Sequence, residues 1–168
     1  MAVPPKNVRP TSSMVKEAIF SVLNSALIKL DLVLSDLKCM DLFAGSGALG
    51  IEALSRGARH VTFVDNNPDS LAAIKQNIKS LSLESRSTVI RGDAVGATKQ
   101  IVETVDLILC DPPYEWINYA DLVGGNYFHL GVFESGHDIS DLVKDSELRV
   151  LKLKKYGTTY LTVVQRVP

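Results

Sequence analysis

The 168-residue sequence has no apolar run that approaches the roughly 20 residues needed to cross a bilayer. Its first residues, MAVPPK, also lack the apolar core of a secretion signal. We therefore expect a cytoplasmic protein that does not enter a membrane. The length favours a single domain over residues 1–168, with an extended, proline-rich N-terminal segment at residues 1–12.

Cysteine and histidine are scarce, with two and three copies respectively. Cys39 and Cys110 each lie in an apolar stretch that leads to an acid, which predicts buried free thiols rather than a disulfide or a metal pair. The histidines show no close spacing, so we expect no metal ion.

An excess of positive charge is also lacking, since the net charge is −1. A strongly basic balance would be the usual sign of a nucleic-acid-binding domain, although local patches can serve the same purpose. Two groups of basic residues occur, one at Lys6, Arg9 and Lys16 and one at Arg149, Lys152, Lys154 and Lys155. An ordinary solvated surface is the favoured interpretation of both groups.

Short apolar runs alternate with segments of helical spacing along most of the chain. Strands are predicted at 39–43, 60–65, 88–91, 105–110 and 130–134, and helices at 13–28, 51–56, 68–81 and 95–103. Two further strands, 149–154 and 158–165, surround Tyr156-Gly157 and indicate a β-hairpin. This order predicts an α/β fold with a doubly wound, mostly parallel sheet that ends in a C-terminal antiparallel hairpin.

A glycine-rich turn, GSGALG at residues 45–50, separates a predicted strand from a predicted helix. Its glycines allow the backbone to approach a ligand closely. Asp65 ends the next strand 20 residues after Gly45, where a carboxylate can bind ribose hydroxyls. These features alone fit a nicotinamide or flavin dinucleotide, so a dinucleotide-dependent oxidoreductase is one alternative.

Acids recur where the predicted strands end, at Asp41, Asp65, Asp93 and Asp111. Ligands of open α/β sheets bind beyond these strand ends, so the four acids predict one crevice. Asp41 would repel a pyrophosphate but attract the sulfonium and amino groups of S-adenosylmethionine. A helix cap is the alternative for each acid, and for Asp93 it is equally well supported.

The stretch DPPY, residues 111–114, follows the buried strand 105–110. Two consecutive prolines lack backbone donors and stop strand pairing, so a plain turn is one interpretation. Together with DLFAGSGALGIEALSRGA and an acid-terminated strand, however, DPPY resembles the RsmD-like methyltransferases, which methylate the exocyclic amino group of a guanine in bacterial 16S ribosomal RNA. RPTSSMVKEAIFSVL likewise resembles the opening helix of that family.

The resemblance implies a class I methyltransferase fold, which is Rossmann-like, and S-adenosylmethionine as methyl donor. It implies methylation of guanine N2 in 16S ribosomal RNA, within the small ribosomal subunit or an assembly intermediate, and we expect a monomer. The implied cofactor contacts are Asp41, Ala44, Gly45, Ser46 and Gly47 for the methionine part, Asp65 for the ribose, and Asn66, Asp93 and Ala94 for the adenine. The implied contacts to the target base are Asp111, Pro112, Pro113 and Tyr114.

The DPPY motif also has a physical rationale. The Asp111 carboxylate and the Pro112 carbonyl can each accept one hydrogen of an amino group, which leaves the nitrogen lone pair directed at the methyl carbon. Both hydrogen bonds strengthen as charge grows on the nitrogen, which stabilises the transition state selectively. Pro113 has no N–H that competes, and Tyr114 can stack on the base.

Three features depart from the family pattern. A basic β-hairpin usually precedes the segment that matches residues 3–5, where this sequence begins, and Ser13 and Met14 replace an acid and an arginine. Residues 115–130 are short for a crossover helix. The aromatic residues of this region are predicted to pack in the core rather than to cover a base, namely Trp116, Tyr119, Tyr127 and Phe128.

Glu134 follows the fifth strand and is given no catalytic role. Two further alternatives to the predicted activity are an amino-group methyltransferase acting on adenine in DNA and a non-catalytic RNA-binding protein with the same fold.

Overall fold

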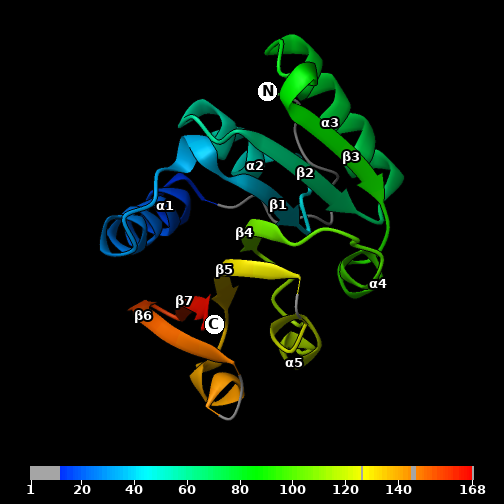
Figure 1. Ribbon diagram of the computed structural model, residues 1–168. Coiled ribbons are helices and arrows are strands. Elements are labelled where there is room, and N and C mark those ends of the chain that lie inside the picture. The colour runs from blue at the N-terminus through cyan, green and yellow to red at the C-terminus, as the bar shows by residue number, and fades with distance from the viewer. Residues whose placement is uncertain (1–11, 126, 145–146, 168) are drawn as a thin grey trace.

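The computed structural model describes residues 12–125, 127–144 and 147–167. The strands of this part of the chain form one sheet in the order β3-β2-β1-β4-β5-β7-β6 (Figure 1). They are β1 (Lys38–Leu42), β2 (His60–Asp65), β3 (Ser87–Arg91), β4 (Val105–Cys110), β5 (Phe128–Ser135), β6 (Leu148–Tyr156) and β7 (Thr159–Arg166). The first five pair in parallel, and β7 lies antiparallel between β5 and β6. The predicted doubly wound sheet with its antiparallel hairpin is confirmed, whereas the division of the chain into domains stays a prediction.

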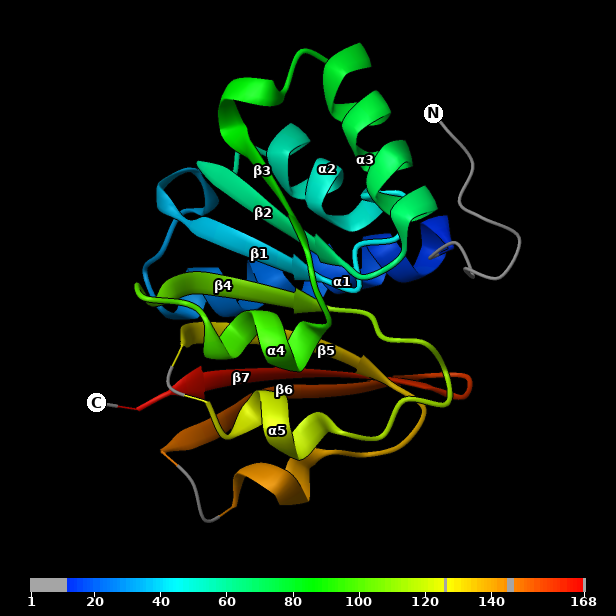
Figure 2. The ribbon, with the colours of Figure 1, turned by 90° about the vertical axis from the view of Figure 1, so that its right-hand side faces the viewer.

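Helices cover both faces of the sheet. Successive residues of a strand point to opposite faces, so the buried apolar residues of one strand pack against helices on both sides. Cys39 of β1 packs with α1 (Ser13–Lys29), α2 (Ala48–Ser55) and α3 (Pro68–Ser80), whereas Met40 packs with α4 (Ala94–Lys99) and α5 (Tyr119–Val123). Figure 2 shows α4 and α5 in front of the sheet and α1 behind it. Short 3-10 helices lie at Leu34–Asp36, Glu84–Arg86 and Ser140–Val143.

Local signals explain where the helices begin. Ser12 accepts the N–H of Val15 at the start of α1, and Asn67 accepts that of Asp69 at 2.8 Å just before Pro68. These are standard N-cap contacts, and proline suits the first turn because its missing N–H has no partner there. The helix after the glycine turn starts at Ala48 rather than at the predicted residue 51, since the left-handed turn already ends at Gly47.

Other boundaries differ from the expectations by a few residues. Helix α4 stops at Lys99, well short of residue 103, and β5 starts at Phe128. The hairpin turns at Gly157, whose φ of 59° lies in the left-handed region that glycine adopts readily. In the described residues of the connection from β4 to β5, the one helix is the five-residue α5, in agreement with the short crossover expected there.

The predicted core assignments hold for most of the aromatic residues and for both cysteines. Tyr119, Tyr127 and Phe128 are buried, whereas Trp116 is half-buried. Cys39 and Cys110 are buried and free, and burial raises the pKa of the Cys39 thiol to about 12. Within the described residues, no helix has both the length and the apolar character required to cross a membrane.

Candidate active site

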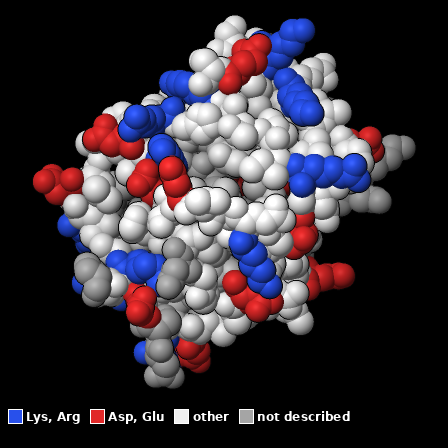
Figure 3. All heavy atoms as spheres, turned by 45° about the vertical axis from the view of Figure 1, so that its right-hand side comes forward, with Lys and Arg blue, Asp and Glu red and all other residues white. Residues whose placement is uncertain are grey.

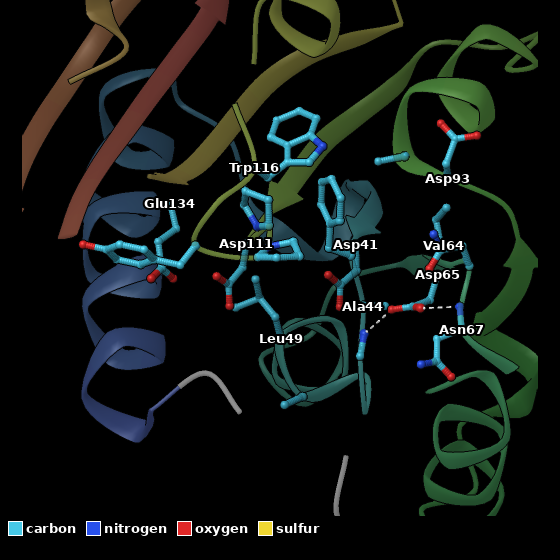
Figure 4. A pocket seen from close by; sticks show the side chains of 18 of the residues that line it. Asp41, Ala44, Leu49, Val64, Asp65, Asn67, Asp93, Asp111, Trp116 and Glu134 are labelled. Carbon is cyan, nitrogen blue, oxygen red and sulfur yellow. Dashed lines mark hydrogen bonds between the residues drawn. The ribbon is translucent and has the colours of Figure 1, made fainter. Parts of the chain in front are cut away.

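A cavity of about 700 Å³ opens at the carboxyl ends of the parallel strands (Figure 4). All but one of the predicted site residues line it, namely Asp41, Ala44, Gly45, Ser46, Asp65, Asn66, Asp93, Ala94, Asp111, Pro112, Pro113 and Tyr114. The exception is Gly47. The cavity therefore brings together the residues predicted to bind a cofactor and those predicted to bind a target base.

Five neighbouring strands each have an acidic residue at or just beyond their carboxyl end. Asp93 follows β3, Asp65 ends β2, Asp41 lies in β1, Asp111 follows β4 and Glu134 lies in β5, and all five line the cavity. Four of them are the acids predicted to outline one crevice, and the structure places them in one. Glu134 is the addition, and its contribution depends on the pairing of β4 with β5, which no local pattern reveals.

Asp41 lies deepest, with 2% of its surface exposed. Its Oδ2 accepts the backbone N–H of Gly50 at 2.8 Å, which ties β1 to the start of α2. The pKa of Asp41 is raised to about 8, chiefly by burial and also by the nearby charges of Asp111 and Asp65, while the Gly50 N–H acts in the opposite direction. A cationic ligand in the cavity would favour the ionised carboxylate.

The side chain of Asp65 forms hydrogen bonds to the backbone of two loops. One carboxylate oxygen accepts the N–H of Gly45 and the other that of Asn67, each at 2.8 Å, as the dashed lines in Figure 4 show. Each oxygen retains a further lone pair, so the carboxylate can still accept ribose hydroxyls. Asp65 therefore has an observed structural task beside its predicted ligand contact.

The glycine loop is held from outside the cavity. Gly47 has a φ of 81°, and a Cβ on it would meet Ile74 and Phe63 at 3.3 Å. Gly47 thus packs the loop against α3 and β2, while its predicted contact to the methionine part stays a prediction. Buried Asn77 of α3 donates from Nδ2 to the carbonyl of Ser46 at 2.9 Å. Nothing in the sequence near Asn77 indicates this anchor, because the partners are 31 residues apart.

Asp93 serves as the N-cap of α4. Its Oδ1 accepts the N–H of Gly96 at 2.7 Å, which is the capping alternative considered from the sequence. The residue also lines the cavity, together with Ala94. The cap is observed, whereas the contact to an adenine edge stays a prediction.

The DPPY segment lines the cavity beside the glycine loop, because β4 and β1 are parallel neighbours. Pro112 is buried, Asp111 is half-buried, and the side chain of Tyr114 is exposed at 64%. The carbonyl of Pro113 accepts the N–H of Trp116 at 2.9 Å, which turns the chain back over the cavity. An exposed aromatic ring at the mouth of a cavity is available for stacking on a planar ligand.

A row of aromatic residues includes two that line the cavity, Phe43 and Trp116. Trp116 contacts Phe43 and Tyr119 edge to face, with centroid distances of 5.0 Å and 4.8 Å respectively. Phe43 has a φ of 62°, which is uncommon for a residue with a side chain. That backbone conformation occurs where β1 turns into the glycine loop. Trp116 therefore packs against the core, as predicted, and also forms part of the cavity wall.

Basic side chains form no large patch on the face in Figure 3, where they are interspersed with acidic ones around a mostly uncharged centre. Arg149 donates to Gln165 and Lys152 to Ser25, and Lys154 and Lys155 are exposed. The C-terminal basic group thus agrees with a solvated surface, while Lys6 and Arg9 lie outside the described residues. In the described part of the chain, no His, Cys, Asp and Glu side chains are grouped so as to hold a metal ion.

A family model described as "Conserved hypothetical protein 95" matches residues 1–165. The chain belongs to this family, the RsmD family. The family predicted from the motifs is therefore confirmed. In the described region, the fold is that of a class I methyltransferase.

Among relatives of this RsmD-family chain, "Putative rRNA methyltransferase YlbH" of Bacillus subtilis is 38% identical over 68% of this chain and 60% of its own length. "Ribosomal RNA small subunit methyltransferase D" of Haemophilus influenzae is 33% identical over 66% of this chain and 55% of its own length. The chain thus spans little more than half the length of these curated relatives. A solved structure titled "Putative methyltransferase yhhF from Escherichia coli" is 25% identical, covers 98% of this chain and 91% of its own, and superposes with a TM-score of 0.80.

Proposed function

We propose that this protein transfers a methyl group from S-adenosylmethionine to the exocyclic amino nitrogen, N2, of a guanine in 16S ribosomal RNA. The observation that carries the proposal is the single cavity that joins the glycine loop and Asp65 to the DPPY segment. The names of the relatives, which are ribosomal RNA methyltransferases, support the same substrate class. We propose a monomer that acts in the cytoplasm on the small subunit or an assembly intermediate.

The residues present fit S-adenosylmethionine. Asp65 retains lone pairs for ribose hydroxyls, and the deeply placed Asp41 offers a carboxylate to a cationic group. Gly45 and Ser46 line the space between these two acids. Backbone without a Cβ at Gly45 lets a ligand approach closely, at a φ of 57° that suits glycine.

S-adenosylmethionine, when bound, supplies a methyl group activated by the positive sulfur. The chain supplies the positioning of the nucleophile. The Asp111 carboxylate and the Pro112 carbonyl accept the two amino hydrogens of guanine, and the exposed ring of Tyr114 stacks on the base. As positive charge develops on the amino nitrogen these hydrogen bonds strengthen, which lowers the barrier.

A base that enters the cavity must leave its stack in the RNA, which costs a few kcal/mol and less in a loop. The mixed charge of the face shown in Figure 3 gives that face little general attraction to RNA. Recognition of shape and of exposed bases in a folded subunit therefore suits this protein better than binding to any extended RNA.

The test is methyl transfer from radiolabelled S-adenosylmethionine to small subunits from a strain that lacks the enzyme, followed by mass spectrometry of the nucleosides. We expect N2-methylguanosine. Asp111→Ala should abolish transfer yet bind S-adenosylhomocysteine with nearly unchanged affinity in calorimetry, and Asp36→Ala, which alters an exposed acid outside the cavity, should behave like the wild type.

Three results would contradict the proposal. Binding of NAD in place of S-adenosylhomocysteine would favour the oxidoreductase, and methylated adenine would favour the DNA-type enzyme. RNA binding without transfer, unaffected by Asp111→Ala, would favour a non-catalytic protein.

A further inference from the structure

Glu134 places a second carboxylate beside Asp111. Strands β4 and β5 are parallel and Cys110 pairs with Phe133, so Asp111 and Glu134 are the next residues on neighbouring strands. Adjacent strands lie about 4.8 Å apart. Both residues line the cavity, and Figure 4 shows their side chains extending to the same side. Two carboxylates thus face the space proposed for the target base.

Glu134 lies in a part of the cavity away from Asp65, the residue proposed to bind the ribose of the cofactor. Strands β4 and β1 lie between the strands that carry Glu134 and Asp65, so two strands separate the two acids along the sheet edge. The exposed ring of Tyr114 lies close to Gly136, just beyond the end of β5, with ring atoms 3.6 Å from a Cβ placed on that glycine. Glu134 and Tyr114 therefore flank the same part of the cavity mouth.

We propose that Glu134 selects guanine over other purines by accepting a hydrogen bond from the N1–H of the target base. This inference rests on the proposed function. Guanine presents N1–H directly next to its exocyclic amino group, and a carboxylate is an acceptor only. With the amino hydrogens held by Asp111 and Pro112, N1–H is the next donor along that edge.

The same carboxylate rejects a base that carries a lone pair at N1. Adenine has such a lone pair, and two acceptors that face each other in a cavity repel and leave both groups unsatisfied. One well-placed contact to a base edge discriminates by about 10- to 100-fold. Glu134 would therefore act on the choice of base, whereas Asp111 acts on the reacting nitrogen.

The backbone of Glu134 is held independently of its side chain. Its carbonyl accepts the hydroxyl of Tyr119 at 3.0 Å, and the strand pairs with β7 opposite Leu161. Glu134→Gln keeps the size of the side chain and these backbone contacts. A glutamine amide can also donate to N1, so the variant should lose selectivity rather than the fold.

The test compares guanine with 2-aminopurine at the target position, mapped beforehand, in 16S ribosomal RNA assembled into small subunits. 2-Aminopurine keeps the amino group on C2 but has a lone pair in place of N1–H. For the wild type, we expect kcat/KM to be about 10- to 100-fold higher with guanine. For Glu134→Gln, the ratio should fall towards one, with unchanged calorimetric affinity for S-adenosylhomocysteine. Glu115→Gln, which changes an exposed acid outside the cavity lining, should keep the wild-type ratio.

A wild-type ratio near one, or an unchanged ratio in Glu134→Gln, would overturn the assignment to Glu134 while leaving guanine methylation intact. If Glu134→Gln fails to fold, two other measurements decide the question. One is the wild-type ratio of kcat/KM with guanine to that with 2-aminopurine. The other is the same ratio for Glu134→Asp, whose shorter carboxylate should reduce it. A wild type that methylates no guanine would instead refute the proposed function. The two failures are thus distinguishable.

Discussion

The carboxylate of Asp65 accepts the backbone N–H of Gly45 at 2.8 Å, and so joins the loop after β1 to the end of β2. Its other oxygen accepts the N–H of Asn67 at the same distance. Because β1 and β2 are parallel neighbours, one side chain fixes the backbone at two adjacent strand ends. The loop geometry and the proposed ribose contact therefore depend on the same residue.

Asp65→Ala should weaken both the fold and the cofactor site. It removes the acceptor of two backbone donors, and hydrogen bonds to charged groups contribute about 1.5–3 kcal/mol each, less where solvent reaches them. We expect the free energy of unfolding in urea to fall by about 2 kcal/mol. Calorimetry should detect little or no binding of S-adenosylhomocysteine. Wild-type affinity in this variant would show that the brace and the ligand contact are dispensable, and Asp36→Ala is the control.

Gly50→Ala should destabilise the protein through overpacking. A Cβ there would contact the ring of Phe63 and lie 2.9 Å from Val61 and 3.0 Å from Oδ2 of Asp41, so β1, β2 or α2 must shift. Such overpacking costs about 1–3 kcal/mol. Gly92→Ala is the matched control, because its nearest contact is an ordinary 3.8 Å to Ala97. Equal unfolding free energies for the two variants would contradict the close packing of α2 on the sheet.

Asp41 should make stability fall as the pH rises. Its pKa is raised from 3.8 to about 8, mainly by burial, so between these values the folded protein holds a proton that the unfolded chain has lost. The stabilisation of the folded protein that is linked to this proton is complete below pH 3.8, and it is lost as the pH rises through about 8. Asp41→Asn stays neutral throughout, and its amide oxygen can still accept the Gly50 N–H.

The stability of Asp41→Asn relative to the wild type should therefore increase from pH 5 to pH 8, by at most about 1.4 kcal/mol per pH unit. Urea unfolding at each pH for both proteins measures this difference. A difference that does not change with pH would mean that Asp41 is ionised in the folded protein throughout this range.

The sequence predicted best those features that one residue or one strand end dictates. Pro112 and Pro113 stop β4, Pro68 starts α3, and acids at the ends of parallel strands meet because those ends share one edge. The fold class, the cavity and most of its lining follow from such local signals.

Features that depend on distant partners escaped prediction. Gly47 matches a ligand-binding motif, and the sequence does not show that its neighbours in the fold are Phe63 of β2 and Ile74 of α3. Glu134 acquires its place beside Asp111 only through the register of β4 and β5. Asn77 anchors the glycine loop from a helix face that looks like an ordinary amphipathic surface in the sequence.

Trp116 should report ligand binding directly. It is the single tryptophan of the sequence, lines the cavity and contacts Phe43 edge to face at 5.0 Å. A ligand in the cavity changes the surroundings of the indole, so we expect its fluorescence to change with added S-adenosylhomocysteine and to saturate at the calorimetric dissociation constant. Trp116→Phe supplies the background signal, and NAD at equal concentration should have no effect. An equal response to NAD would favour a dinucleotide site, whereas an unchanged emission despite calorimetric binding would exclude Trp116 from the ligand's surroundings.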